Sequence, residues 1–215
     1  MPDLNAIIAV TMAGLALSVT PGPSMLYVLS RSLGQSRAAG LASALGLGVG
    51  GVILALATAL GLAALFERLG WLVPMLQFAG SVYLAWLGWG MIRTARDNAS
   101  RALTATDVAT TDRFLGIFWQ GVLVEVLNPK TVLFFALFLP PFAGAGIDQG
   151  VTVDMQAQLL VLGALVPLTA LPSDLVVAFC GGTFAKTVNH YQDARRHLGT
   201  ACGVTLIAIA VSLHL

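Results

Sequence analysis

Three ionisable side chains, Glu125, Lys130 and Asp174, lie within stretches of the sequence that are otherwise apolar. A charge inside a membrane is costly unless it is paired or hydrated, so such a residue usually faces a partner or a water-filled cavity. If the three side chains meet, Lys130 can hold a carboxylate, and Glu125 or Asp174 can hold an ammonium group or carry a proton. Two structural alternatives stay open. Lys130 could snorkel along its helix or pair with one of the acids. Asp174 could lie in a loop created by Pro167 and Pro172.

The first of two proline motifs lies within the first apolar stretch and must interrupt a helix. Pro21 lacks the N–H group that would bond to the carbonyl of Leu17. Pro23 likewise leaves the carbonyl of Val19 without its donor. Carbonyls freed in this way are tolerated in a membrane only against protein or a wet cavity. The N–H groups of the half-helix that begins near Ser24 favour an anion such as a carboxylate. The motif consists of Thr20, Pro21, Gly22, Pro23 and Ser24.

A second motif, Asn128-Pro129-Lys130, repeats this arrangement about half a chain length later. Pro129 removes the donor for the carbonyl of Glu125 and so frees another polar group within an apolar stretch. Each motif alone could be a structural kink, because proline is common in membrane helices. The pair, with a charged residue in the second motif, predicts two helix breaks that line one substrate site near the membrane centre.

Small residues recur four positions apart in the stretch that follows the first motif, at Gly40, Ala44 and Gly48, with Gly46 and Gly50 beside them. Small side chains at this spacing let helices approach one another closely. We therefore expect this face to pack against other helices, within the bundle or across a dimer. A place along a substrate path is the alternative.

The composition indicates that these motifs belong to a membrane protein. Of the 215 residues, 57% are hydrophobic and only 10% are charged, whereas about a quarter of a soluble protein is charged. The apolar stretches lack the alternation of barrel strands, and helices satisfy their own backbone groups in lipid. The sequence therefore predicts an all-α integral membrane protein with six transmembrane helices, of which the first and fourth are broken. The spans are expected at residues 5–30, 39–66, 71–92, 114–142, 156–181 and 198–214.

Three helices in each half would give the two halves opposite orientations, which is the inverted repeat common in secondary transporters. We expect a single transmembrane domain, with repeat one at residues 1–93, a cytoplasmic linker at 94–113 and repeat two at 114–215. Nine of the eleven Lys and Arg residues fall in three alternate connections, the first of which contains Arg31 and Arg37. Because positive residues favour the cytoplasmic side, both termini are expected outside the cytoplasm.

Several other functions have no support in the residues. The net charge of +1 does not favour a nucleic-acid partner. Cys180 and Cys202 have neither the spacing of a redox pair nor a histidine cluster that would hold a metal. The serines lack the accompanying His–Asp arrangement of a hydrolase. We therefore expect no enzyme activity, no cofactor and no metal.

The motifs resemble those of the LysE/RhtB family of amino-acid exporters. The resemblance rests on the runs from Ser18 to Pro23, from Ser30 to Leu41 and from Gly121 to Phe135, and it covers nearly the whole chain. It implies a multi-pass permease of the bacterial inner membrane that exports an amino acid or a close derivative. It also implies a drive by the proton motive force, a homodimer as one form of assembly, and a substrate pathway lined by both proline motifs.

One position departs from the family pattern. Family members usually have asparagine three residues before the asparagine of the second motif, where this chain has Glu125. A carboxylate there would favour cationic amino acids or amines, or it would pair with Lys130 and leave the substrate unchanged. The same superfamily contains redox and metal carriers, but their working cysteines are absent from the first and fourth spans. A membrane channel and a lipid-handling scaffold are the remaining alternatives.

Overall fold

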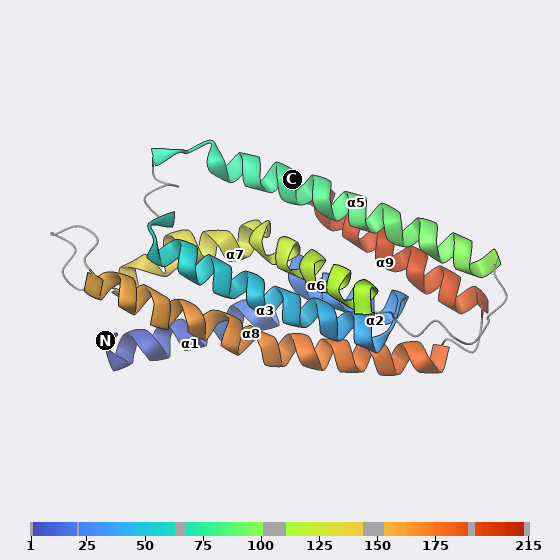
Figure 1. The fold of residues 1–215 in the computed structure, drawn as a ribbon, viewed down its shortest axis with the longest axis horizontal. Coiled ribbons are helices and arrows are strands. Elements are labelled where there is room, and N and C mark those ends of the chain that lie inside the picture. The colour runs from blue at the N-terminus through green and yellow to red at the C-terminus, as the bar shows by residue number, and fades with distance from the viewer. Residues whose placement is uncertain are drawn as a thin grey trace.

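The computed structural model of the chain describes residues 2–20, 22–62, 68–100, 111–143, 153–188 and 192–212. Regular structure in this part of the chain is entirely helical, as the composition predicts (Figure 1). Three helices are long and apolar enough to cross a membrane, or up to five if each of two bent pairs counts as one span. The elements are α1 (Leu4–Val19), α2 (Pro23–Gly34), α3 (Arg37–Ala59), α5 (Leu72–Ser100), α6 (Thr111–Val126), α7 (Pro129–Leu133), η1 (Phe134–Phe138), η2 (Pro140–Ala143), α8 (Val153–Val188) and α9 (Gln192–Ser212).

Both predicted helix breaks are present. α1 and α2 meet at an angle of 46°, and α6 meets the helical segment Pro129–Ala143 at 50°. The helix after each break begins with a proline, Pro23 in α2 and Pro129 in α7, at a position where no N–H group is needed. The fourth span then continues through the π-helical turn η1, in which the Leu139 amide donates to the Phe134 carbonyl at 3.1 Å.

The expected fifth span is one continuous helix. α8 runs for 36 residues and contains both Pro167 and Pro172. The alternative in which these prolines place Asp174 in a loop is therefore wrong. Prolines are tolerated inside a membrane helix where neighbouring groups satisfy the carbonyls they free, and α8 packs against α1, α2 and α3.

α3 lies at the centre of the bundle, in contact with both α6 and α8, while α5 pairs with α9 along one side (Figure 1). Glycines let α3 approach α6 closely. A Cβ atom on Gly46 would collide with the carbonyl oxygen of Phe118, and one on Gly121 would lie 2.6 Å from the carbonyl oxygen of Ser43. The expectation that small residues of this span serve helix packing is confirmed at Gly46, whereas Gly48 lines a pocket.

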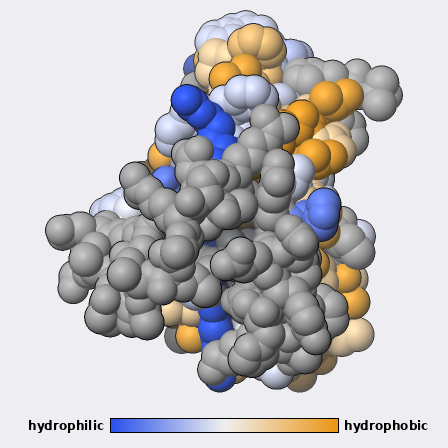
Figure 2. Space-filling view, turned by 90° about the vertical axis from the view of Figure 1, so that its right-hand side faces the viewer, coloured by the Kyte–Doolittle hydropathy of each residue, from blue (hydrophilic) through white to orange (hydrophobic). Residues whose placement is uncertain are grey.

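The helices run along the long axis, so that their ends gather at the two ends of the bundle. The C-terminal ends of α2, α5 and α8 lie at the same end, at the right of Figure 1. Seen from that end, hydrophobic residues in orange lie at the top and along the right side of the view, with hydrophilic residues in blue among them (Figure 2). α5 reaches Ser100 and α6 begins at Thr111, so helix extends into both sides of the expected linker. Residues 101–110 lie outside the described part of the chain.

Arg31 lies inside α2, and its expected place in a loop is wrong because the helix continues to Gly34. Its side chain is only 5% exposed. The Nε atom donates to the hydroxyl of Tyr27 at 3.2 Å, and Nη2 donates to Oε1 of Gln120 on α6. The guanidinium thus joins α2 to α6 near the end of the bundle where α2 ends.

The close approach of α3 and α6 can be tested with two glycines on α6. Gly121→Ala places a methyl group against the backbone of Ser43, and we expect a loss of about 1–3 kcal/mol in the free energy of unfolding. Gly116→Ala is the matched control, because a Cβ atom there meets nothing within 4 Å. Alanine favours helix over glycine, so this control should be neutral or slightly stabilising. Denaturant unfolding in detergent micelles measures both, and equal stabilities would contradict the packing.

Candidate functional site

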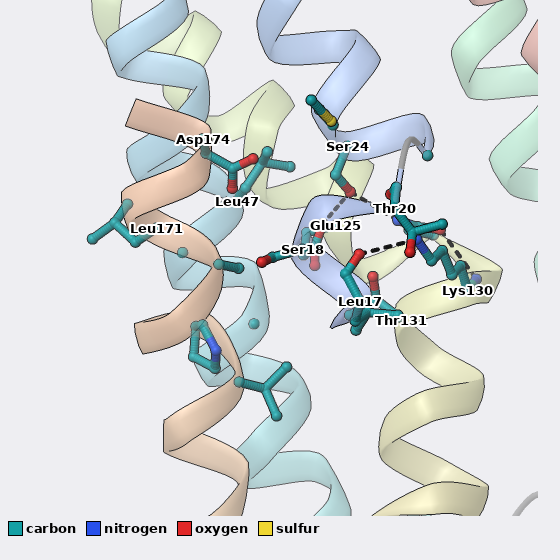
Figure 3. Close-up of a pocket in the computed structure, with 18 of the residues that line it drawn as sticks. Leu17, Ser18, Thr20, Ser24, Leu47, Glu125, Lys130, Thr131, Leu171 and Asp174 are labelled. Atoms are coloured by element: carbon teal, nitrogen blue, oxygen red, sulfur yellow. Dashed lines mark hydrogen bonds between the residues drawn. The ribbon is translucent and has the colours of Figure 1, made fainter. Parts of the chain in front are cut away.

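A pocket lies where the two helix breaks meet, with α3 and α8 forming its other wall (Figure 3). Its volume is about 590 Å³, which includes the open space at its mouth. Seven of the ten residues that the sequence proposes for a site line this pocket. They are Thr20, Gly22, Ser24, Glu125, Asn128, Lys130 and Asp174.

Lys130 of α7 joins the second helix break to the first. Its Nζ atom donates to the carbonyl of Leu17 at 3.1 Å and to the carbonyl of Thr20 at 2.9 Å, both at the end of α1 (Figure 3). The carbonyl of Leu17 is the one for which Pro21 was expected to remove the donor, and the ammonium group supplies another. Lys130 makes no ion pair with Glu125 or Asp174 in the described chain. One of its three N–H groups is left for a further acceptor.

Glu125 belongs to a chain of hydrogen bonds across the two breaks. The Nδ2 atom of Asn128 donates to Oγ of Ser24 at 2.8 Å, and Oγ of Ser24 donates to the carboxylate of Glu125. Asn128 also caps α7, because its Oδ1 accepts from the amide of Lys130 at 3.1 Å. The expectation that Pro129 leaves the carbonyl of Glu125 free is wrong, since the amide of Asn128 donates to it at 3.1 Å. The turn at the end of α6 thus supplies a donor from within the break itself.

Asp174 is the pocket carboxylate whose oxygens have no protein partner among the described residues. It lies in the middle of α8, is 8% exposed, and has no hydrogen-bond or ion-pair partner within the described segments. In Figure 3 it is seen across the pocket from Lys130. Buried polar groups are nearly always satisfied, and a carboxyl group left without a partner is costly. The missing partner of Asp174 is therefore expected to come from water, a proton or a ligand in the pocket.

The N-terminus of α2 is open toward the same space. The helices α1, α3 and α7 are capped by the side chains of Asp3, Ser36 and Asn128. α2 has no such cap, because Gly22 at the cap position has no side chain. The first turn of α2 therefore presents unsatisfied N–H groups, which favour an anion. Gly22 lies next to Lys130, since a Cβ atom there would be in van der Waals contact with Nζ at 3.4 Å.

Two of the prolines that the sequence proposes for the site, Pro23 and Pro129, do not line the main pocket. Pro23 and Pro129 line a smaller cavity of about 190 Å³ beside it, together with Gly80 and Tyr83 of α5. Pro21 lies outside the described residues. Pro23 and Pro129 thus each begin a helix, and the polar groups of the pocket are supplied by their neighbours in the two motifs.

The sequence reasoning missed most of the apolar wall. Leu47 and Gly51 line the pocket from α3, and Pro167 and Leu171 line it from α8. Residues 167, 171 and 174 are four and three positions apart, which is the spacing of one helix face. Asp174 could therefore have indicated this face of α8, but nothing in the sequence indicates which face of α3 lies opposite.

The described residues offer binding groups for charges and no metal site. No group of three or more His, Cys, Asp or Glu side chains is found in this part of the chain that could hold a metal ion. Cys180 and Cys202 are both free thiols and do not line the pocket. The pocket therefore combines a cation and a helix N-terminus with a carboxylate on the facing helix.

Comparison with known proteins assigns the chain to a family. The family model for LysE type translocators matches residues 15–215. The chain belongs to the LysE family. This LysE-family chain is 27% identical to the threonine efflux protein of Escherichia coli K12 over 146 residues, which cover 67% of the chain and 69% of that protein. It is 27% identical to the leucine efflux protein of Salmonella choleraesuis over 195 residues, or 89% of the chain and 84% of that protein.

These findings confirm the resemblance seen in the sequence. Together with the apolar helices, membership of the LysE family identifies a multi-pass bacterial membrane protein of a transporter family. A third relative, the threonine efflux protein of Salmonella typhi, is 28% identical over 169 residues, or 74% of the chain and 81% of that protein. No solved structure matches the chain.

The contacts of Lys130 predict a structural effect that does not depend on transport. Lys130→Met removes two charge-assisted hydrogen bonds and leaves the carbonyls of Leu17 and Thr20 without their donor. We expect a loss of about 2–4 kcal/mol in the free energy of unfolding. Arg93→Met is the control, since Arg93 is an exposed cation of α5. If both variants unfold at the same denaturant concentration as the parent in detergent, Lys130 does not join the two breaks.

Proposed function

We propose that this protein is a proton-coupled exporter of amino acids or their close derivatives in the bacterial inner membrane. One observation carries the proposal: a buried, unpartnered carboxylate, Asp174, lines the same pocket as an uncapped helix N-terminus and the ammonium group of Lys130. An amino acid has one positive and one negative group on neighbouring atoms, so such a pocket is complementary to it. The efflux activity named for the relatives supports the same substrate class.

In the proposed mode of binding, the substrate carboxylate lies at the N-terminus of α2. The open amides of the first turn and the third N–H group of Lys130 would hold it. The substrate ammonium would lie against Asp174. Glu125 would act mainly on the protein itself, because its carboxylate already accepts from Ser24 in the chain of hydrogen bonds that joins the breaks.

The proposed architecture has six spans in an inverted repeat, with repeat one at residues 1–93 and repeat two at 114–215. The packing of the helices supports it. α3 packs on α8 and α5 packs on α9, which are the second and third helices of each half. α3 also packs on α6 of the other half, just as α8 packs on α1 and α2. The equivalent helices α3 and α8 run in opposite directions in Figure 1, and so do α5 and α9.

Lys and Arg residues support an orientation with both termini outside the cytoplasm. Arg37 and Arg93 lie at the end of the bundle where α2, α5 and α8 end, and buried Arg31 lies near the same end. By the positive-inside rule this is the cytoplasmic end. Amino acids would then enter the pocket from that end and leave at the opposite one.

Proton coupling would follow if a proton and the substrate ammonium compete for Asp174. Protonated Asp174 has no charge with which to attract an ammonium group, so a proton arriving from outside would release the substrate. The empty and protonated site could then return to the cytoplasmic side. Coupling by competition for one carboxylate needs no second ion site.

Purified protein in liposomes tests this proposal. Asp174→Asn should raise the KM for amino-acid counterflow about tenfold or more, because a buried charge pair is lost. Transport that remains should no longer respond to a pH gradient. An unchanged response of Asp174→Asn to the gradient would assign coupling elsewhere, and failure of the parent protein to move any labelled amino acid would exclude the function. Flux that does not saturate would instead indicate a channel.

Glu125→Gln separates the two carboxylates in the same assay. Glutamine still offers an oxygen to Oγ of Ser24, so we expect this variant to keep both transport and its dependence on the pH gradient. Glu125→Asn, measured over a panel of neutral and cationic amino acids, should leave selectivity unchanged. A shift of selectivity away from cationic substrates would show that Glu125 contacts the substrate.

A further inference from the structure

The apolar wall of the pocket contains a gap at one position of α3. Gly48 lines the pocket between Leu47 and Gly51 of α3, and Leu171 of α8 is its nearest neighbour there. We propose that Gly48 is a specificity-determining residue, whose missing side chain leaves the space that receives the aliphatic side chain of a neutral amino acid. This inference rests on the proposed function and adds a substrate class to it.

Gly48 differs from the glycines next to it in what a side chain would meet. A Cβ atom on Gly50 would lie 2.6 Å from Cβ of Glu125, and one on Gly51 would lie 2.9 Å from Cβ of Pro167. Helix packing therefore explains why both are glycine. A Cβ atom on Gly48 would meet only the flexible end of Leu171, at 3.7 Å. Packing does not require glycine at this position, and the space beside it belongs to the pocket.

The chemistry of this wall favours an aliphatic group over a charged one. Beside Gly48 the wall is made by Leu47, Leu171, Ala170 and Pro167, which offer no side-chain hydrogen-bond donors or acceptors. A charged substrate side chain placed here would lose its hydration without compensation. An apolar side chain would gain from the burial of its surface.

The position of Asp174 directs the substrate side chain toward the same gap. Asp174 lies about one turn of α8 beyond Leu171. An ammonium group bound by this buried, unpartnered carboxylate holds the Cα atom of the amino acid close to the wall formed by Leu171. With the carboxylate directed to the N-terminus of α2, the side chain has the space at Gly48 available to it.

Counterflow with amino acids of increasing size tests the inference. The series is alanine, 2-aminobutyrate, valine and leucine, measured with the parent protein, Gly48→Ala and Gly48→Val in liposomes. The ratio of leucine to alanine transport, as kcat/KM, should fall about tenfold or more in Gly48→Val, with Gly48→Ala intermediate. Gly116→Val is the matched control, because a Cβ atom at Gly116 meets nothing within 4 Å and that residue is not in the pocket. Its ratio should equal that of the parent.

A compensating change in the facing residue makes the test more specific. Leu171→Ala removes bulk opposite position 48, so the double variant Gly48→Val with Leu171→Ala should regain leucine transport relative to alanine. An unchanged ratio in an active Gly48→Val, or an equal loss for every amino acid, would overturn the inference. If Gly48→Val does not fold, the ratio in Gly48→Ala decides in the same way. A parent protein that moves no amino acid would instead overturn the proposed function.

Discussion

The hydrogen bonds from the ammonium group of Lys130 to the end of α1 are the interaction on which the rest of the site depends. A helix that breaks within a membrane leaves carbonyls that lipid cannot satisfy. Here Lys130 of α7 supplies a cation to the carbonyls of Leu17 and Thr20 at the end of α1. An unpaired cation and unpaired carbonyls would each be costly within a membrane. Here each satisfies the other through hydrogen bonds. The two breaks must therefore lie side by side, and the pocket is the space that remains between them.

This arrangement also decides which charged groups remain available in the pocket. Lys130 and Glu125 both have partners supplied by the protein, from the first span in one case and from Ser24 in the other. Asp174 has none in the described chain, although it is the most deeply buried of the three. The groups that hold the site together are thus distinct from the carboxylate that is free to take a ligand. Two acids that look equivalent in the sequence differ for this reason.

The sequence predicts the breaks well because their cause is local. Pro23 and Pro129 occupy the first positions of α2 and α7, where a proline is favoured because no N–H group is needed. The sequence predicts less well which partner each freed carbonyl or buried charged side chain contacts, since that depends on how the helices rotate against one another. The partners of Lys130 are 110 and 113 residues away in the chain. The continuity of α8 through two prolines is decided by its neighbours in the bundle. The local sequence therefore leaves open a loop at Asp174, where the structure has a continuous helix.

The two breaks are related in sequence but differ in what they leave unsatisfied. The residue before the first helical proline is Asn128 in one and Gly22 in the other. Asn128 caps α7 with its own side chain, whereas Gly22 leaves the first turn of α2 open. The nearby hydroxyl of Thr20 donates back to the carbonyl of Ala16 at 2.6 Å, at the end of α1. A Cβ atom at position 22 would lie in van der Waals contact with the side chain of Lys130, at 3.4 Å. The missing side chain of Gly22 thus leaves the first turn of α2 uncapped beside the cation that joins the breaks.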